Sequence, residues 1–194
     1  MPRDFRFTKE EVVAAALELT REGGIGAVTA RGLAARLGSS SKPVFSLFSG
    51  MEEVQKAVME AADGLYQSYL REDMAGGKYP PYKASGMAYI RFAKEERELF
   101  KLLFMRDRSR EEKPGWADVG ELIGLIQKGT GLSREAAQLF HLEMWVYVHG
   151  IAAMIATAYL DFDEETVSRM LSDMYWGLRS RSREEWEGSG AGKV

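Results

Sequence analysis

The apolar side chains of this chain recur at the spacing of an α-helix along nearly the whole sequence. Period-two alternation, the signature of a half-buried strand, never persists. The clearest apolar stripe follows Asp163 and covers three turns: Val167, Met170, Leu171, Met174, Tyr175 and Leu178. A helix with one apolar face must bury that face against other helices. We therefore predict an all-α fold.

Capping residues and helix breakers divide this pattern into separate helices. Thr8, with Glu11 three residues later, has the pattern of a capping box, so the first helix begins there. Thr29 opens a second, short helix, and Gly38 ends it, because glycine readily adopts the left-handed conformation that closes a helix. A third helix is expected to begin near Ser40 or Ser41. The helices after it are expected to span about 52–71, 82–94, 96–105, 115–128 and 133–160, and a last helix is expected from residue 163 onward.

Composition excludes several classes of protein. The chain of 194 residues has no cysteine, which rules out disulfide scaffolds, thiolate metal sites and thiol catalysis. The N-terminus has no apolar stretch of signal-peptide length, so we expect a cytoplasmic protein. Residues 144–160 are nearly all apolar but are shorter than the roughly 20 residues that span a bilayer. We expect them to form a buried helix, with no membrane contact.

Nothing in the sequence indicates a cofactor or a metal. The two histidines, His141 and His149, lie on one expected helix, about 12 Å apart by the helical rise, so one chain cannot bring both to one ion. We interpret His149 as a core histidine in preference to a ligand contact. No nucleophile–base pair or phosphate-binding loop is recognisable, which argues against an enzyme.

Charge is unevenly divided along the chain. Residues 1–50 carry seven basic and five acidic side chains, whereas residues 51–194 carry nineteen and twenty-four, for an overall net charge of −3. A mildly basic N-terminal part on an acidic remainder suits a protein that presents one end to phosphates. Many proteins that do not bind nucleic acid have a charge asymmetry of this size. The asymmetry is therefore compatible with nucleic-acid binding but does not indicate it.

Residues 30–49 have the pattern of a helix-turn-helix. Two helices that cross steeply need a small residue at the contact and a turn residue tolerant of positive φ, and Ala34 and Gly38 stand at these places. Phe45 and Phe48 are expected mainly in the core between these helices. The other apolar residues at suitable offsets are Leu33, Leu37, Val44 and Leu47.

Over residues 8–58 the chain resembles the TetR/AcrR family of one-component regulators, in which a three-helix head ends in a short recognition helix followed by an aromatic pair. The stretch here reads Thr29-Ala-Arg-Gly-Leu-Ala-Ala-Arg-Leu-Gly-Ser-Ser-Ser-Lys-Pro-Val-Phe-Ser-Leu-Phe-Ser-Gly-Met-Glu-Glu-Val54. Where the family usually has Tyr, His and a later Lys, this chain has Phe45, Leu47 and Met51. In the family the Tyr hydroxyl and the Lys ammonium commonly contact phosphates, so these departures imply weaker and less salt-dependent DNA binding.

A weaker resemblance covers the C-terminal part. Trp145-Val-Tyr-Val-His149-Gly150 is similar to the Trp…His-Gly segment of one TetR subgroup, and residues 88–105 are similar to its paired middle helices. The resemblance implies a C-terminal helical domain that binds an effector and dimerises. We accordingly divide the chain into a DNA-binding domain at 1–50, an effector-binding and dimerisation domain at 51–187, and a mobile tail at 188–194.

On this interpretation the second and third helices contact double-stranded DNA. Lys42 and Ser46 are the leading candidates, while Thr29 and Ser40 are expected to cap helices as well. Arg3, Arg6 and Lys9 form either an arm along the DNA or a solvated terminus. The candidate DNA-contacting residues are Thr29, Ser40, Ser41, Lys42, Phe45 and Ser46.

Large, adaptable side chains on helices that are expected to converge indicate a pocket for an apolar or aromatic effector. The candidate pocket residues are Tyr89, Phe92, Phe104, Met105, Met144, Trp145, His149 and Met154. For any one of them, a role in the core is the simpler interpretation. Small residues on the penultimate helix let another helix approach closely and indicate a homodimer formed by the last two helices. The candidate interface residues are Ala153, Ala156, Met170 and Met174.

The sequence therefore predicts a DNA-binding transcriptional regulator, a repressor by family resemblance, that binds a palindromic operator as a homodimer and is released by a small molecule. Two other classes stay open. One is an all-α enzyme, and the other is a helical ligand-binding or partner-binding protein whose head has lost its role on DNA. The identity of the effector and the sequence of the operator are not encoded in any recognisable motif.

Overall fold

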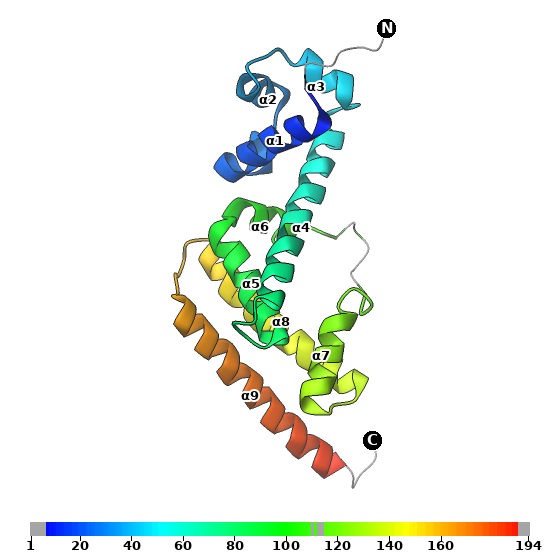
Figure 1. Cartoon of the computed structure of the whole chain (residues 1–194), viewed down its shortest axis with the longest axis vertical. Helices are drawn as coiled ribbons and strands as arrows, with labels where there is room; N and C mark the ends of the chain where they lie inside the picture. The colour runs from blue at the N-terminus through cyan, green and yellow to red at the C-terminus, as the bar shows by residue number, and fades with distance from the viewer. Residues whose placement is uncertain (1–6, 110, 112–114, 190–194) are drawn as a thin grey trace. The chain divides into compact units, whose positions relative to one another are not determined.

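A computed structural model of the protein describes residues 7–109, 111 and 115–189, and every regular element in these ranges is a helix (Figure 1). The prediction of an all-α fold is confirmed.

The N-terminal helices begin and end where the caps predict. Helix α1 (Lys9–Gly23) starts with a complete capping box, since the Thr8 hydroxyl accepts from the Glu11 amide at 3.1 Å and the Glu11 carboxylate accepts from the Thr8 amide at 2.8 Å. A short 3₁₀ turn, η1 (Ile25–Ala27), precedes α2 (Ala30–Arg36). Thr29 caps α2, and Gly38 follows it with φ +58°. The third helix, α3 (Lys42–Leu47), completes the head.

The remaining helices agree with the expected order but differ at three boundaries, the first being the end of the fourth helix, which lies at Ala75 and not near residue 71. They are α4 (Met51–Ala75), α5 (Pro81–Glu95), α6 (Arg97–Phe104), α7 (Gly120–Thr130), α8 (Arg134–Ala156) and α9 (Glu164–Ser189). The expected start of α7 at residue 115 is wrong, because residues 116–119 form turns, in which the Gly115 amide donates to the Asp118 carboxylate at 2.8 Å. The expected end of α8 at residue 160 is also wrong. Ala158 adopts φ +55°, the left-handed conformation, which cannot continue a right-handed helix.

The chain forms two compact units. The first unit consists of Met1–Tyr69 and Phe92–Asp107, and the second consists of Leu70–Arg91 and Arg108–Val194. Helix α6 therefore belongs to the same unit as the three-helix head. The predicted division at residue 50 concerns functional domains and stays a prediction. Of the predicted tail, residues 188 and 189 still belong to α9, and residues 190–194 lie outside the described residues.

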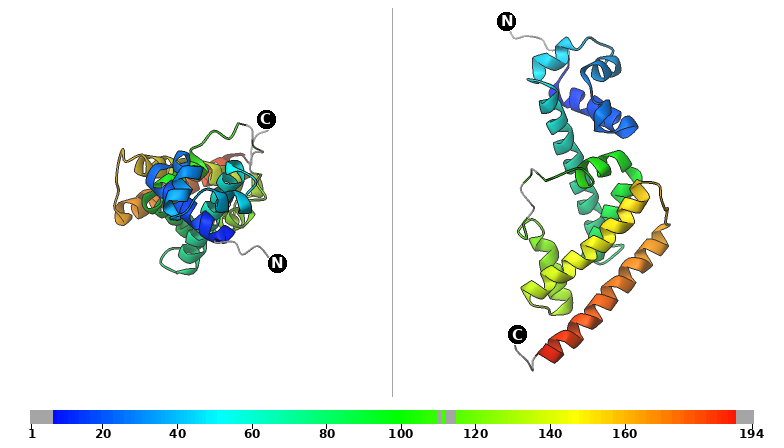
Figure 2. Two further views of the ribbon diagram at one scale, coloured as in Figure 1. Left: turned by 90° about the horizontal axis from the view of Figure 1, so that it is seen from above. Right: turned by 180° about the vertical axis from the view of Figure 1, so that it is seen from behind.

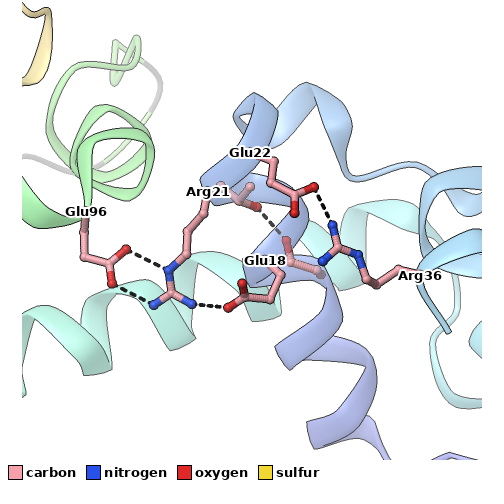
Figure 3. Close-up of polar contacts among 7 residues, drawn as sticks. Glu18, Arg21, Glu22, Arg36 and Glu96 are labelled. Carbon is pink, nitrogen blue, oxygen red and sulfur yellow. Dashed lines mark hydrogen bonds and ion pairs between the residues drawn. The ribbon is translucent and has the colours of Figure 1, made fainter.

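The core of the first unit joins the head to α4 and α6. Its buried side chains come from all of these helices and include Val12, Leu33, Val44, Phe48, Val58 and Leu102. Ion pairs reinforce the packing at the edge of this core (Figure 3). The Nε and Nη2 atoms of Arg21 donate to the two carboxylate oxygens of Glu96, at the start of α6, at 2.8 and 2.7 Å. Arg36 of α2 is likewise paired with Glu22 of α1.

The core of the second unit lies between α7, α8 and α9. The members of this cluster are Ile123, Ile126, Ala137, Phe140, Met144 and Leu178. Figure 2 shows α8 and α9 side by side. By length and composition alone α8 is apolar enough to cross a membrane. Its buried residues recur every three or four positions, from Ala137 to Ala156, so α8 is a core helix packed on its neighbours.

The turn at Gly38 provides a test of the helix-turn-helix geometry. Gly38→Ala should lower the free energy of unfolding by about 1–2 kcal/mol, because φ +58° is unfavourable for a residue with a Cβ while the space around it is open. Gly64→Ala, at an equally open position inside α4, should raise it by about 0.5–1 kcal/mol. Urea denaturation of both variants measures the difference. Equal effects of the two substitutions would contradict the left-handed turn.

Candidate nucleic-acid interface

The short helix α3 has one buried face and one exposed face. Val44 is fully buried and Phe48 is 3% exposed, so both anchor α3 in the core of the first unit. Lys42, Phe45 and Ser46 lie on the other face and are exposed. The expectation that Phe48 is a core residue is confirmed, whereas the same expectation for Phe45 is wrong, since its side chain is 47% exposed. One residue along a helix turns the side chain by about 100°, which moves Phe45 off the face of Val44.

The hydroxyl groups of this surface differ in what they can still bind. The Ser46 hydroxyl donates to the Pro43 carbonyl at 2.7 Å, so towards a ligand it can only accept. The Thr29 hydroxyl accepts from the Gly32 amide at 3.0 Å and keeps its hydrogen for donation. Ser41 occupies the N-cap position of α3 without a side-chain capping bond. Ser40 is exposed just before it and is not the N-cap residue, so the expectation that Ser40 caps this helix is wrong.

The structure adds one basic residue that the sequence analysis missed. Arg31 lies exposed in the first turn of α2, two residues after Thr29. Neither Arg31 nor Lys42 forms an ion pair within the described part of the chain, whereas Arg36 and Lys9 are paired with Glu22 and Glu53. A cation in the first turn of a helix interacts unfavourably with the helix dipole. The position of Arg31 was therefore a signal in the sequence that this residue could have a role other than stabilising the helix. The predicted arm residues Arg3 and Arg6 lie outside the described residues.

Leu47 and Met51 occupy the positions of the family's His and later Lys. Both side chains are half-buried and pack against the core of the first unit. Met51 therefore makes apolar contacts where the family usually has a phosphate-contacting Lys, and the exposed cations nearby are Lys42 and Arg31.

A groove of about 610 Å³ also lies between α1 and α4 in the first unit. The ion pair of Lys9 with Glu53, at 2.9 Å, joins its two walls, and the Phe48 ring lies below the Lys9 ammonium, 4.9 Å away. These contacts hold α1 against α4 and so stabilise the packing of the three-helix head on α4.

The predicted effector residues are divided between the two units. Phe92, Phe104 and Met105 belong to the first unit, where the Tyr66 ring contacts Phe92 and Phe104 at centroid distances of 5.4 and 5.1 Å. Met105 is exposed. The other predicted residues belong to the second unit: Tyr89, Met144, Trp145, His149 and Met154.

In the second unit three of these residues form a contiguous aromatic group. The Tyr89 hydroxyl lies 2.9 Å from Nδ1 of His149, and the Trp145 ring stacks on the imidazole at a centroid distance of 5.5 Å. Met144 belongs to the core, and Met154 is exposed. Burial lowers the pKa of His149. The half-buried histidine therefore has both a hydrogen-bond partner and an aromatic neighbour, while the pocket itself stays a prediction.

A second Tyr–His pair was not predicted. The Tyr82 hydroxyl lies 3.1 Å from Nδ1 of the buried His141. Burial raises the pKa of Tyr82 and lowers the pKa of His141, so both side chains are held uncharged and share one hydrogen bond whose direction is set by the imidazole tautomer. Both tyrosines come from α5 and both histidines from α8, so the two pairs join these helices. The i, i+7 spacing of Tyr82 and Tyr89 was the sequence signal.

Together, the described residues form a helix-turn-helix head with an exposed third helix and a C-terminal helical bundle. The family model described as "Tetracyclin repressor-like, C-terminal domain" matches residues 82–174, just under half of the chain. Residues 82–174 are therefore similar to a TetR-like C-terminal domain, and the membership of the whole chain in the TetR family stays a prediction.

One solved structure with a similar chain is that of a TetR variant from Acinetobacter baumannii AYE in complex with minocycline. The two chains are 19% identical, and the match covers 90% of this chain and 94% of that chain with a TM-score of 0.47. No curated protein is similar enough to this chain to count as a match.

The buried histidine predicts a pH dependence of stability. Burial holds the pKa of His141 below the value of 6.5 that an unperturbed histidine has, so the unfolded chain binds the proton more readily. The free energy of unfolding should therefore fall as the pH is lowered below about 6.5. In His141→Gln, denaturation between about pH 7.5 and 5.5 should show a smaller pH dependence than in the wild type. An unchanged dependence would contradict a buried, neutral His141.

Proposed function

We propose that the protein is a transcriptional repressor that binds a palindromic operator as a homodimer and leaves it when a small apolar or aromatic molecule binds. The observation that carries this proposal is the exposed face of α3, with Lys42, Phe45 and Ser46, in a helix-turn-helix joined to a TetR-like C-terminal domain. A recognition helix enters the major groove with its exposed face towards the bases. Such a role fits the predicted location in the cytoplasm.

The charges of the head support this orientation. Lys42 on α3 and Arg31 on α2 are exposed on successive helices of the helix-turn-helix, where they are available to phosphates. The acidic side chains Glu18, Glu22 and Glu96 are instead engaged by Arg21 and Arg36. Phosphate contacts position a protein on DNA, whereas side chains in the groove give the sequence preference.

The assembly is proposed to use α8 and α9. Large apolar side chains on α8 are exposed in the single chain, namely Leu139, Leu142 and Val146. They stand at i, i+3 and i+7, so they form one stripe, and an exposed apolar stripe of this kind marks an interface. The predicted interface residues Ala153, Met170 and Met174 are half-buried. Ala156 is 1% exposed and already contacts its own chain, so it offers little surface to a partner.

The effector is proposed to bind the second unit near the group formed by Tyr89, Trp145 and His149. The Trp145 ring is exposed and can stack on an aromatic molecule, and His149 beside it is a polar group that can orient the ligand. Binding releases the operator only if the effector prefers the state that does not bind DNA, because equal affinity for both states shifts nothing.

The DNA-binding proposal is tested by selection of an operator from random-sequence DNA, followed by gel shifts. Lys42→Ala should weaken binding to all sequences and reduce the slope of log affinity against log salt by about one, as for the loss of one phosphate contact. Ser46→Ala should instead change the preferred bases. The control is Lys56→Ala, which removes an exposed cation of α4 away from α3. Wild-type binding by both α3 variants would show that α3 is not the recognition helix.

The homodimer is tested by sedimentation at micromolar concentration. Val146→Glu places a charge on an exposed position of α8, so the single chain should stay folded while the dimer dissociates, because the charge would be buried unpaired. Gly124→Glu adds the same charge at an open position of α7 and should leave the dimer intact. A monomeric wild type, or a dimeric Val146→Glu, would remove the proposed interface.

A further inference from the structure

The exposure of Phe45 is unusual for this part of the molecule. Within the described residues of the first unit, the large apolar side chains that are exposed are Phe45 and Met105. The neighbouring aromatic ring of the head, Phe48, is buried in the core. Phe45 shares its face of α3 with Lys42 and Ser46, at i, i−3 and i+1. An apolar ring therefore lies in the middle of the surface that the proposed function places against DNA.

The chemistry of the ring limits what it can recognise there. A phenyl group has no donor or acceptor, so it cannot contact a phosphate by a hydrogen bond or read the polar edge of a base. The apolar group on a base edge in the major groove is the C5-methyl group of thymine, which phenylalanine contacts. Thymine is the base that offers such a ring an apolar partner.

The neighbours of Phe45 complete the surface with other chemistry. The Lys42 ammonium, one turn before it, is available to a phosphate, and the Ser46 hydroxyl, whose hydrogen is held by the Pro43 carbonyl, can only accept a hydrogen bond. Of the three exposed side chains, Phe45 is therefore the one suited to an apolar contact.

We propose that Phe45 is a specificity-determining residue that packs against a thymine methyl group in each operator half-site. This inference rests on the proposed function, since it assumes that α3 enters the major groove. On binding, the ring loses its contact with water and the methyl group fills the space beside it. The hydrophobic gain is available only where a thymine stands, so the ring selects that base.

The experiment removes the methyl group without changing base pairing. In the operator obtained by selection, each thymine is replaced in turn by uracil, which lacks only the C5-methyl group, and the dissociation constant is measured with the full-length protein. At one thymine of each half-site the affinity of the wild type should fall about fourfold, the change that corresponds to one buried methyl group. With Phe45→Ala the same replacement should have no further effect, as expected for two groups that contact each other.

Two further variants separate this role from a general loss of binding. Phe45→Leu keeps an apolar contact and should keep most of the sensitivity to uracil. Lys42→Ala should weaken binding to both DNAs equally and leave their ratio unchanged. Because Phe45 is exposed, its replacement should not lower the melting temperature, which a thermal unfolding scan checks.

The outcomes distinguish the two levels of the proposal. A selected operator that is bound equally well with uracil at every position, or the same uracil sensitivity in Phe45→Ala and the wild type, would overturn the role of Phe45 and leave the DNA-binding function standing. A protein that selects and binds no DNA would overturn both.

Discussion

The exposed surface of α3 depends on the two apolar side chains that hold this helix from behind. Six residues are too few to form a stable helix alone, so the orientation of α3 is set by the burial of Val44 and Phe48. The same burial decides which residues remain outside. Once Val44 and Phe48 face the core, Lys42, Phe45 and Ser46 must face solvent. The surface proposed to contact DNA therefore consists of the side chains that this packing leaves exposed.

The head is further fixed by a helix from much later in the chain. Helix α6 lies within the region that matches the TetR-like C-terminal domain, yet it packs in the first unit, where Leu102 enters the core of the head. Glu96, at its start, accepts two hydrogen bonds from Arg21 (Figure 3), and its own side chain is only 13% exposed. The boundary between family domains therefore differs from the boundary between compact units.

In the second unit, polar contacts determine which helix faces pack together. Apolar contacts alone would specify this pairing less well. Two tyrosines of α5 form hydrogen bonds with two histidines of α8, and burial lowers the pKa of both imidazoles. Lys83 of α5 is similarly bound to the hydroxyls of Ser168 and Ser172 on α9. Half-buried polar groups are costly unless they are satisfied, so these pairs fix which faces of α5, α8 and α9 meet.

The helical fold, the caps at Thr8 and Thr29, and the turn at Gly38 could be predicted from the sequence, because periodicity, capping and positive φ depend on residues close together in the chain. The sequence did not determine that Phe45 is exposed, since two adjacent aromatic candidates have the same local pattern and only packing against α1 and α4 decides between them. The Tyr–His pairs and the packing of α6 depend on tertiary structure, because the partners in these contacts lie 59 to 75 residues apart in sequence.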